Sequence, residues 1–364
     1  MSVRQFDQKV LEKLLKEPKN SLEHLNLVYV KNDMLSIERI KKQGHYHYLI
    51  EGKSLDKKAH LERINSLVIP PAWNEVKITH LANGHLQAIG RDAKYRKQYR
   101  YHPIWNSVRN RTKFYKMIAF GKALPKIRQR VEKDLGQKGW PKTKVLALII
   151  RLMEETHIRV GNEQYARRNK TYGLSTLRTK HVQIFNDSLK FEFTGKKGKK
   201  HKITVRNKEL VRLVSRCEEI PGWELFQYFD NNGQKKSVDS SMVNEYLHNT
   251  SGSLFTAKDF RTWAASIIFF DTLMELGTGT KESDIQQNLR SAYDMAAKAL
   301  GNTRNVCKKY YVHPLLVASY ENGAISKTFE QTERTVKPKR FFSPSENAVL
   351  QLYKKYSPLD YLKN

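Results

Sequence analysis

Short alternations of apolar and polar residues run through the first hundred positions of the chain. The stretches 27–30 and 34–37 flank a polar turn at 31–33, and this arrangement predicts a β-hairpin. A further strand is predicted over 45–50, directly ahead of Glu51-Gly52. The amino-terminal part of the chain is therefore expected to be rich in strands.

Beyond about Arg109 the apolar positions follow a helical period instead. The residues that repeat at the spacing of one helix face are Val145, Leu148, Ile149, Leu152 and Met153. Pro141 stands where a helix typically begins, and Gly161 is the predicted stop signal. Two longer helices are predicted around 258–276 and 283–300.

Three short stretches interrupt these helices with strand-like patterns. They cover 182–185, 189–193 and 203–205, and they predict a small antiparallel sheet with a lysine-rich tip over 196–200. The predicted fold class is therefore α+β, with a strand-rich N-terminal part and a mainly α-helical part that contains this small sheet.

The change of pattern predicts two domains, and 364 residues suffice for two cores. A β-rich domain is predicted over 1–108 and a mainly α-helical domain over 109–364, with an extra tail after about 325. The tail has a basic stretch at 337–340. It also predicts a helix over 345–356 that lies on the surface or is partly disordered, and no chemistry is assigned to it.

Charge indicates the class of partner. Lys and Arg number 66 against 36 Asp and Glu, which gives a net charge of +30. Such an imbalance predicts binding to a polyanion, and nucleic acid is favoured. A membrane surface is the weaker alternative, since the sequence has no long amphipathic helix or lipidation signal.

The two cysteines, Cys217 and Cys307, exclude a disulfide scaffold and a cysteine zinc site. With no apolar leader at the N-terminus, a cytoplasmic location is predicted. The glycines of Gly277–Lys281 have the wrong spacing for a phosphate-binding loop, and the sequence has no His-Glu-x-x-His or Asp-x-Asp. We therefore expect no nucleotide cofactor and no metal.

The segment Asn302–Pro314 places tyrosines after a run of cations. A free tyrosine hydroxyl has a pKa of about 10, and nearby positive charge favours the nucleophilic phenolate and holds an anionic target beside it. A phosphodiester is the obvious target. The alternative is that Tyr310 and Tyr311 are structural, as most of the 18 tyrosines must be.

Phosphoryl transfer also needs fixed donors for the phosphate oxygens and an acid for the leaving oxygen. Arginine suits the first role and lysine the second. Four other segments offer such groups: Gly90–Pro103, which interleaves cations with aromatic residues; Glu155–Leu177; the hairpin Phe193–His201; and Lys258–Trp263. Each also has a plain alternative as a solvated turn or a basic surface.

Together the five segments resemble, in the same order, motifs of the type IB DNA topoisomerases, in their small bacterial and poxviral form. The patterns are Gly-Arg-Asp-x-x-x-Arg-x-Gln-Tyr-x-Tyr, Tyr-Gly-Leu-x-Thr-Leu after an Arg-x-Gly-Asn, Phe-x-Gly-Lys, Lys-Asp-x-Arg-Thr, and Asn/His-Thr-Pro-x-x-Cys-Arg-x-x-Tyr-x-His-Pro. The resemblance covers roughly residues 25–320. The related tyrosine recombinases have His-x-x-Arg where this chain has Lys258, which favours the topoisomerase.

The resemblance implies a set of catalytic residues. Tyr311 is the nucleophile, Arg159 and Arg261 hold the phosphate, and Lys196 is the general acid. Asn302 stands where poxviral relatives have histidine, so it is expected to donate a hydrogen bond without carrying charge. Residues implied to contact DNA are Arg91, Lys94, Arg96, Lys97, Gln98, Tyr99, Lys197, Lys199, Lys200 and Lys258.

The implied activity is relaxation of supercoiled duplex DNA through a 3′-phosphotyrosyl intermediate, without ATP or metal. The implied protein is a nucleoid-associated monomer whose two domains close around DNA, with no membrane partner. Two alternatives stay open: a recombinase-like strand transferase and a non-enzymatic architectural DNA binder.

Overall fold

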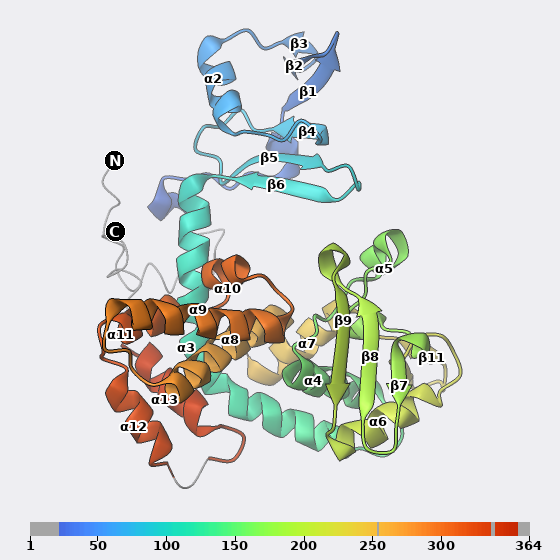
Figure 1. Ribbon diagram of the computed structural model, residues 1–364. Coiled ribbons are helices and arrows are strands. Elements are labelled where there is room, and N and C mark those ends of the chain that lie inside the picture. Colours follow the sequence, from blue (N-terminus) through green and yellow to red (C-terminus); the bar gives the residue numbers. More distant parts are fainter. Residues whose placement is uncertain (1–21, 253–254, 336–338, 356–364) are drawn as a thin grey trace. The chain divides into compact units, whose positions relative to one another are not determined.

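The computed structural model of the chain describes residues 22–252, 255–335 and 339–355 (Figure 1). The chain divides into two compact units between Lys116 and Met117, inside helix α3 (Pro103–Leu135). The predicted domain boundary after residue 108 lies in the same helix. Among the described residues, no helix combines the length and the apolar character needed to cross a bilayer.

A six-stranded antiparallel sheet forms the first unit, with the strand order β3-β2-β1-β4-β5-β6. Its core contains Ile37, Val76 and Ile78 of the sheet together with Ile64 of helix α2. The elements are η1 (Leu22–Leu25), η2 (Asn32–Met34), β1 (Ile37–Lys42), β2 (His45–Ile50), β3 (Lys53–Ser54), α2 (Lys58–Ser66), β4 (Asn74–Ile78), β5 (Leu86–Arg91) and β6 (Lys97–Tyr101).

The strand predicted over 45–50 is confirmed, but the hairpin predicted over 27–37 is wrong. The hairpin joins β1 to β2 and turns at Gln43 (φ 49°) and Gly44 (φ 83°). Positive φ at both central residues is what a two-residue turn between twisted strands requires. The apolar residues Leu27, Val30 and Leu35 instead fill two small separate clusters, so their spacing does not reflect strand pairing.

The second unit is mainly helical and contains a three-stranded antiparallel sheet, β7-β8-β9. Its helices are α4 (Lys142–Thr156), α5 (Glu163–Asn169), α6 (Lys208–Glu218), α7 (Ser240–Ser251), α8 (Ala257–Leu276), α9 (Glu282–Leu300), α10 (Arg304–Tyr310), α11 (Pro314–Glu321), α12 (Ser326–Glu333) and α13 (Pro344–Tyr353). Its strands and 3-10 turns are η3 (Leu174–Thr176), η4 (Thr179–His181), β7 (Val182–Ile184), β8 (Leu189–Thr194), η5 (Lys196–Gly198), β9 (Lys200–Val205), β10 (Gln227–Phe229) and β11 (Lys235–Ser237). The predicted α+β fold class, the small sheet and the helices near 258–276 and 283–300 are confirmed.

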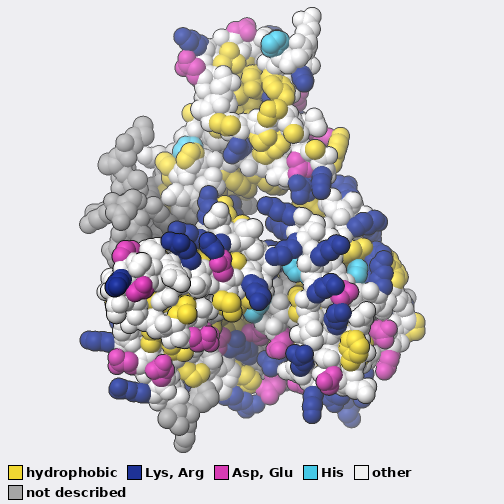
Figure 2. Space-filling model, viewed as in Figure 1, with side chains coloured by type: hydrophobic (Ala, Val, Ile, Leu, Met, Phe, Trp, Pro, Cys, Tyr) yellow, Lys and Arg dark blue, Asp and Glu magenta, His cyan; other side chains and the backbone are white. Residues whose placement is uncertain are grey.

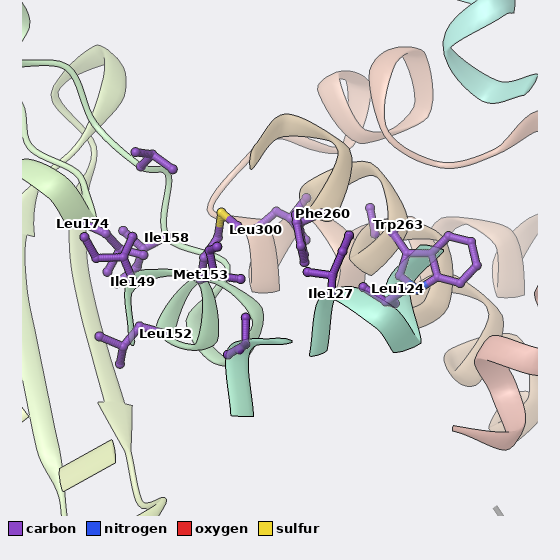
Figure 3. Packing of buried hydrophobic residues seen from close by; sticks show 14 of the residues in the cluster. Leu124, Ile127, Ile149, Leu152, Met153, Ile158, Leu174, Phe260, Trp263 and Leu300 are labelled. Atoms are coloured by element: carbon purple, nitrogen blue, oxygen red, sulfur yellow. The ribbon is translucent and has the colours of Figure 1, made fainter. Parts of the chain in front are cut away.

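Helix α4 is the centre of this unit, because every residue from Lys144 to Ile150 is buried. Figure 3 shows Ile149 and Leu152 facing Leu174 on the side of the small sheet. Met153 and Leu300 lie next in the same core, between these residues and the pair formed by Phe260 of α8 and Ile127 of α3.

The helix start that Pro141 predicts is confirmed, but the predicted stop at Gly161 is wrong. The helix ends at Thr156, and His157 adopts the left-handed conformation (φ 54°).

The C-terminal tail is not a surface helix. Helix α13 buries Val349, Leu350, Leu352 and Tyr353 against the core of the second unit. The predicted basic stretch at 337–340 lies partly outside the described residues.

The ion pair that attaches α13 is a bidentate one. Arg128 of α3 donates from Nη1 and Nη2 to the two Glu346 carboxylate oxygens at 2.7 and 2.8 Å. Trp263 Nε1 donates to the same carboxylate at 3.0 Å. Glu346 is 7% exposed, and its hydrogen bonds hold its pKa below the ordinary value although burial opposes this.

Glu346→Ala should lower the free energy of unfolding by about 3–5 kcal/mol, because it leaves the Arg128 guanidinium buried with one partner fewer. Urea denaturation measures the loss. The matched control is Glu330→Ala, whose partner Arg334 lies 3.9 Å away on the surface. That variant should lose less than about 1 kcal/mol. Equal losses in the two variants would contradict a structural role for the α13 ion pair.

Candidate active site

Arg159 lies in the extended segment that follows α4. Its backbone carbonyl accepts a hydrogen bond from Leu174 N at 2.8 Å, and the Val160 carbonyl accepts one from Ser175 N at 2.6 Å. Its side chain is half-buried, and Nη2 donates to Asn302 Oδ1 at 2.7 Å. The structure therefore brings together two predicted site residues that are far apart in sequence.

Two glycines allow this backbone pairing. A Cβ atom at Gly173 would stand 2.4 Å from the Arg159 carbonyl oxygen and 2.6 Å from Gly161 N, both shorter than any real contact. Gly161 itself has φ 105°, which side chains disfavour. The Tyr-Gly-Leu motif thus fixes the backbone of the first candidate arginine.

Arg261 lies in the first turns of α8 and is 4% exposed. Its guanidinium donates to the His157 carbonyl, and through Nη2 to the Leu300 carbonyl at 2.8 Å. Burial and the nearby charge of Arg159 lower the pKa of Arg261 to about 10, so it stays cationic at neutral pH. Asp259 accepts hydrogen bonds from the backbone N–H and hydroxyl of Thr256, the N-cap of α8, as the acidic residue of a capping box does.

Tyr311 and its neighbour Tyr310 lie in different environments. Tyr311 follows the last residue of α10, is half-buried, and has the Arg261 guanidinium 5.5 Å from its ring centroid. Tyr310 is 40% exposed, and Lys309 lies over its ring at 5.6 Å. The geometry therefore favours Tyr311 as the functional tyrosine.

The environment of the Tyr311 hydroxyl is cationic. Burial alone would raise the pKa of Tyr311, but Arg261 and Arg159 outweigh this through charge and hydrogen bonds, so the pKa lies below the usual 10. A lowered pKa makes the phenolate easier to form near neutral pH.

Asn302 follows α9 and completes the group. Its Oδ1 accepts from Arg159, while its Nδ2 is buried with the weakly accepting Cys307 thiol beside it and has no oxygen or nitrogen acceptor among the described residues. Cys307 lies one turn ahead of Tyr311. A buried amide donor without a strong acceptor is costly in a resting protein, so this N–H is available to an incoming oxygen.

Lys196 opens the turn η5 between β8 and β9. Its side chain is exposed, yet partial desolvation, then Arg159, Lys197 and Lys258 lower its pKa while Tyr311 opposes them. A neighbouring cluster of lysines also lowers the pKa of Lys196, but desolvation is the leading cause of the shift. Lys196 borders a small pocket with Arg159 and His201.

The remaining candidate DNA contacts of the second unit, Lys197, Lys199, Lys200 and Lys258, are all exposed. Figure 2 shows Lys and Arg side chains gathered over α10 and over the ends of β8 and β9. This surface can attract a phosphate backbone.

In the first unit, three of the candidate DNA contacts are tied to carboxylates. Arg91 pairs with Glu75 at 2.7 Å, and Asp92 accepts from Arg96 and Gln98. The hydrogen bond from Arg96 is the main cause that lowers the pKa of Asp92 to about 2, although desolvation acts in the opposite direction. The exposed candidates are Lys94, Lys97 and Tyr99, the last 46% exposed. The carboxylates thus order the segment that presents them.

Two further residues, to which the sequence motifs assign no role, border the site. His201 stacks on Phe193 with ring centroids 5.0 Å apart, and its ring would stand 2.7 Å from a Cβ at Gly301. Ser266 Oγ donates to the Tyr311 carbonyl at 3.3 Å. Hairpin pairing of β8 with β9 sets His201 beside Phe193, and tertiary packing brings Ser266 to the site.

Comparisons with known proteins agree with the motifs. The family model for "Eukaryotic DNA topoisomerase I, catalytic core" matches residues 100–338, and that for "Bacterial DNA topoisomerase IB, N-terminal domain" matches residues 44–92. These two matches together extend over both units.

Individual relatives carry corresponding names. The chain is 35% identical over 285 residues to the DNA topoisomerase 1B of Acanthamoeba polyphaga mimivirus, covering 76% of this chain and 84% of that protein. It is 27% identical over 229 residues to the DNA topoisomerase 1B of Vaccinia virus (strain Copenhagen), covering 62% and 69%. It is 26% identical over 275 residues to the DNA topoisomerase 1 of Mycosarcoma maydis, covering 69% of this chain and 26% of that protein.

The family that the sequence motifs predict is confirmed by these matches: the chain belongs to the type IB DNA topoisomerases.

Proposed function

We propose that the protein relaxes supercoiled duplex DNA by cutting and resealing one strand, with Tyr311 as the nucleophile. The observation that carries this proposal is the position of Tyr311: the buried Arg261 guanidinium lies 5.5 Å from its ring centroid, and the half-buried Arg159, which is hydrogen-bonded to Asn302, joins Arg261 in lowering its pKa. The family supports the same activity.

The chemistry follows from the groups present. The Tyr311 hydroxyl loses its proton to water, and the phenolate oxygen attacks the phosphorus. The bond from phosphorus to the 5′ oxygen breaks, and Lys196 gives its proton to that oxygen. Arg159, Arg261 and Asn302 donate to the non-bridging oxygens, where negative charge develops. The products are a 3′-phosphotyrosyl link and a free 5′-hydroxyl.

Rotation of the free end removes supercoils, and the 5′-hydroxyl then attacks the phosphotyrosine to restore the strand. The covalent link conserves the energy of the phosphodiester, so the proposed cycle consumes no ATP and uses no metal. We propose that the protein acts as a monomer associated with the nucleoid in the cytoplasm.

One assay separates the candidate activities. Supercoiled plasmid is incubated with the protein in EDTA without ATP. Relaxation supports the topoisomerase. Binding without relaxation supports an architectural DNA binder, and recombined products support a strand transferase.

Tyr311→Phe should abolish both plasmid relaxation and the covalent complex that detergent traps on DNA, because the nucleophilic oxygen is gone. The matched control is Tyr310→Phe, which changes the adjacent, exposed tyrosine and should retain activity. An active Tyr311→Phe protein would rule out the proposed nucleophile.

Asn302→Ala should slow single-turnover cleavage by about 10²–10³, as loss of one oxyanion donor does elsewhere. Asn302→His keeps an N–H donor at this position and should lose much less. A rate for Asn302→Ala equal to that of the wild type would remove the amide from the site.

Lys196→Ala should slow cleavage by about 10²–10⁴, the usual contribution of a general acid. A substrate with sulfur in place of the leaving 5′ oxygen needs no proton and should restore most of the rate. Since the pKa of Lys196 lies below its ordinary value, the wild-type rate should fall on the alkaline side as that proton is lost. Lack of rescue by sulfur would argue against Lys196 as the acid.

A further inference from the structure

The last residue of helix α13 lies directly behind the nucleophile segment. The Tyr353 ring stacks on the His313 ring with centroids 3.9 Å apart and an interplanar angle of 24°. Both residues are 0% exposed. His313 follows Tyr311 by two positions, so the tail reaches the segment on which the proposed reaction depends.

His313 and Ser266 together hold the backbone of Tyr311. His313 caps α11 by accepting from Leu315 N at 3.2 Å through Nδ1. Its own N–H donates to Ser266 Oγ at 3.1 Å, and the Ser266 hydroxyl donates to the Tyr311 carbonyl at 3.3 Å. Ser266 therefore joins the chain on either side of Val312 to helix α8, which also carries Arg261.

Tyr311 itself has little other backbone support. It is not helical (φ −127°, ψ −42°), and its N–H donates to the Cys307 carbonyl at 3.0 Å. The position of its backbone, from which the side chain reaches Arg261 and Arg159, thus depends in part on how the next residues are fixed.

Helix α13 is attached to α8 at two places. Near its start, Glu346 accepts from Trp263 Nε1 at 3.0 Å and pairs with Arg128. At its end, the Tyr353 ring meets the Trp263 ring edge-on, with centroids 6.1 Å apart, and the Tyr353 hydroxyl faces Ser266. Tyr353 is thereby set at a defined position relative to Ser266 and His313.

We propose that Tyr353 is a positioning residue for the nucleophile. Its ring fixes the His313 ring, and His313 together with Ser266 holds the Tyr311 backbone at a fixed position relative to Arg261. This inference rests on the proposed role of Tyr311. A displacement of about 1 Å at a reacting group can cost about 10² in rate, so loosening this contact should slow cleavage without weakening DNA binding.

The test compares three variants of the full chain in single-turnover formation of the covalent complex at saturating protein. Tyr353→Leu removes the stacking ring and should slow cleavage about 10- to 100-fold. Tyr353→Phe keeps the ring and should cleave within about 2-fold of the wild type on the same reasoning. The matched control Val349→Ala removes buried volume from the same helix and should retain the cleavage rate. DNA affinity should be equal in all three variants.

A second variant approaches the contact from the other side. His313→Asn keeps a side chain that can cap α11 but has no ring for Tyr353, and it should slow cleavage as Tyr353→Leu does. If Tyr353→Leu does not fold, the cleavage rate of His313→Asn tests the positioning role in its place.

A wild-type cleavage rate in folded Tyr353→Leu or His313→Asn, or equal slowing by Val349→Ala, would overturn the positioning role. A wild-type protein that forms no covalent complex would instead refute the proposed function.

Discussion

The second unit depends on one constraint. It must hold the buried cation of Arg261 beside Tyr311, with a second cation, Arg159, close by. Arg159 and Arg261 repel each other, and burial adds to the cost. The structure offsets both by giving Arg261 the carbonyls of His157 and Leu300, which lie at the C-terminal ends of α4 and α9. The partial negative charge at helix C-termini stabilises a cation there. Two helix ends must therefore converge on the start of α8.

The rest of the unit can be understood from this convergence. The buried helix α4 fixes the position of His157, and the glycine contact at 173 fixes the backbone of Arg159. The small sheet ends in the turn that carries Lys196, and α13 covers the back of α8. The packing of these elements limits the positions that the proposed catalytic side chains can take.

Local apolar patterns predicted α4, α8, α9 and the small sheet. Helix α9 and strand β8 bury one face with a regular spacing, whereas α4 is buried on every side over residues 144–150. These patterns failed where packing across the chain decides: Gly161 serves a close backbone approach and not a helix end, and Glu346 makes the tail part of the core. The proposed site residues followed from motifs that resemble a family, and the structure places Arg159, Arg261, Asn302 and Tyr311 together. Ser266 had no local signal, since its contacts with Tyr311 and His313 depend on a segment distant in sequence, and His201 lies in the predicted hairpin but reaches Gly301 only through tertiary packing.

The position of α13 in the chain has a consequence for the order of events during synthesis. All five proposed catalytic residues precede it, so they leave the ribosome before Glu346 and Tyr353 do. A nascent chain can thus bring two arginines and a tyrosine together before the contacts behind that tyrosine exist. Emergence of α13 from the ribosome then adds the Glu346 and Tyr353 contacts behind a tyrosine whose arginine neighbours have already been synthesised.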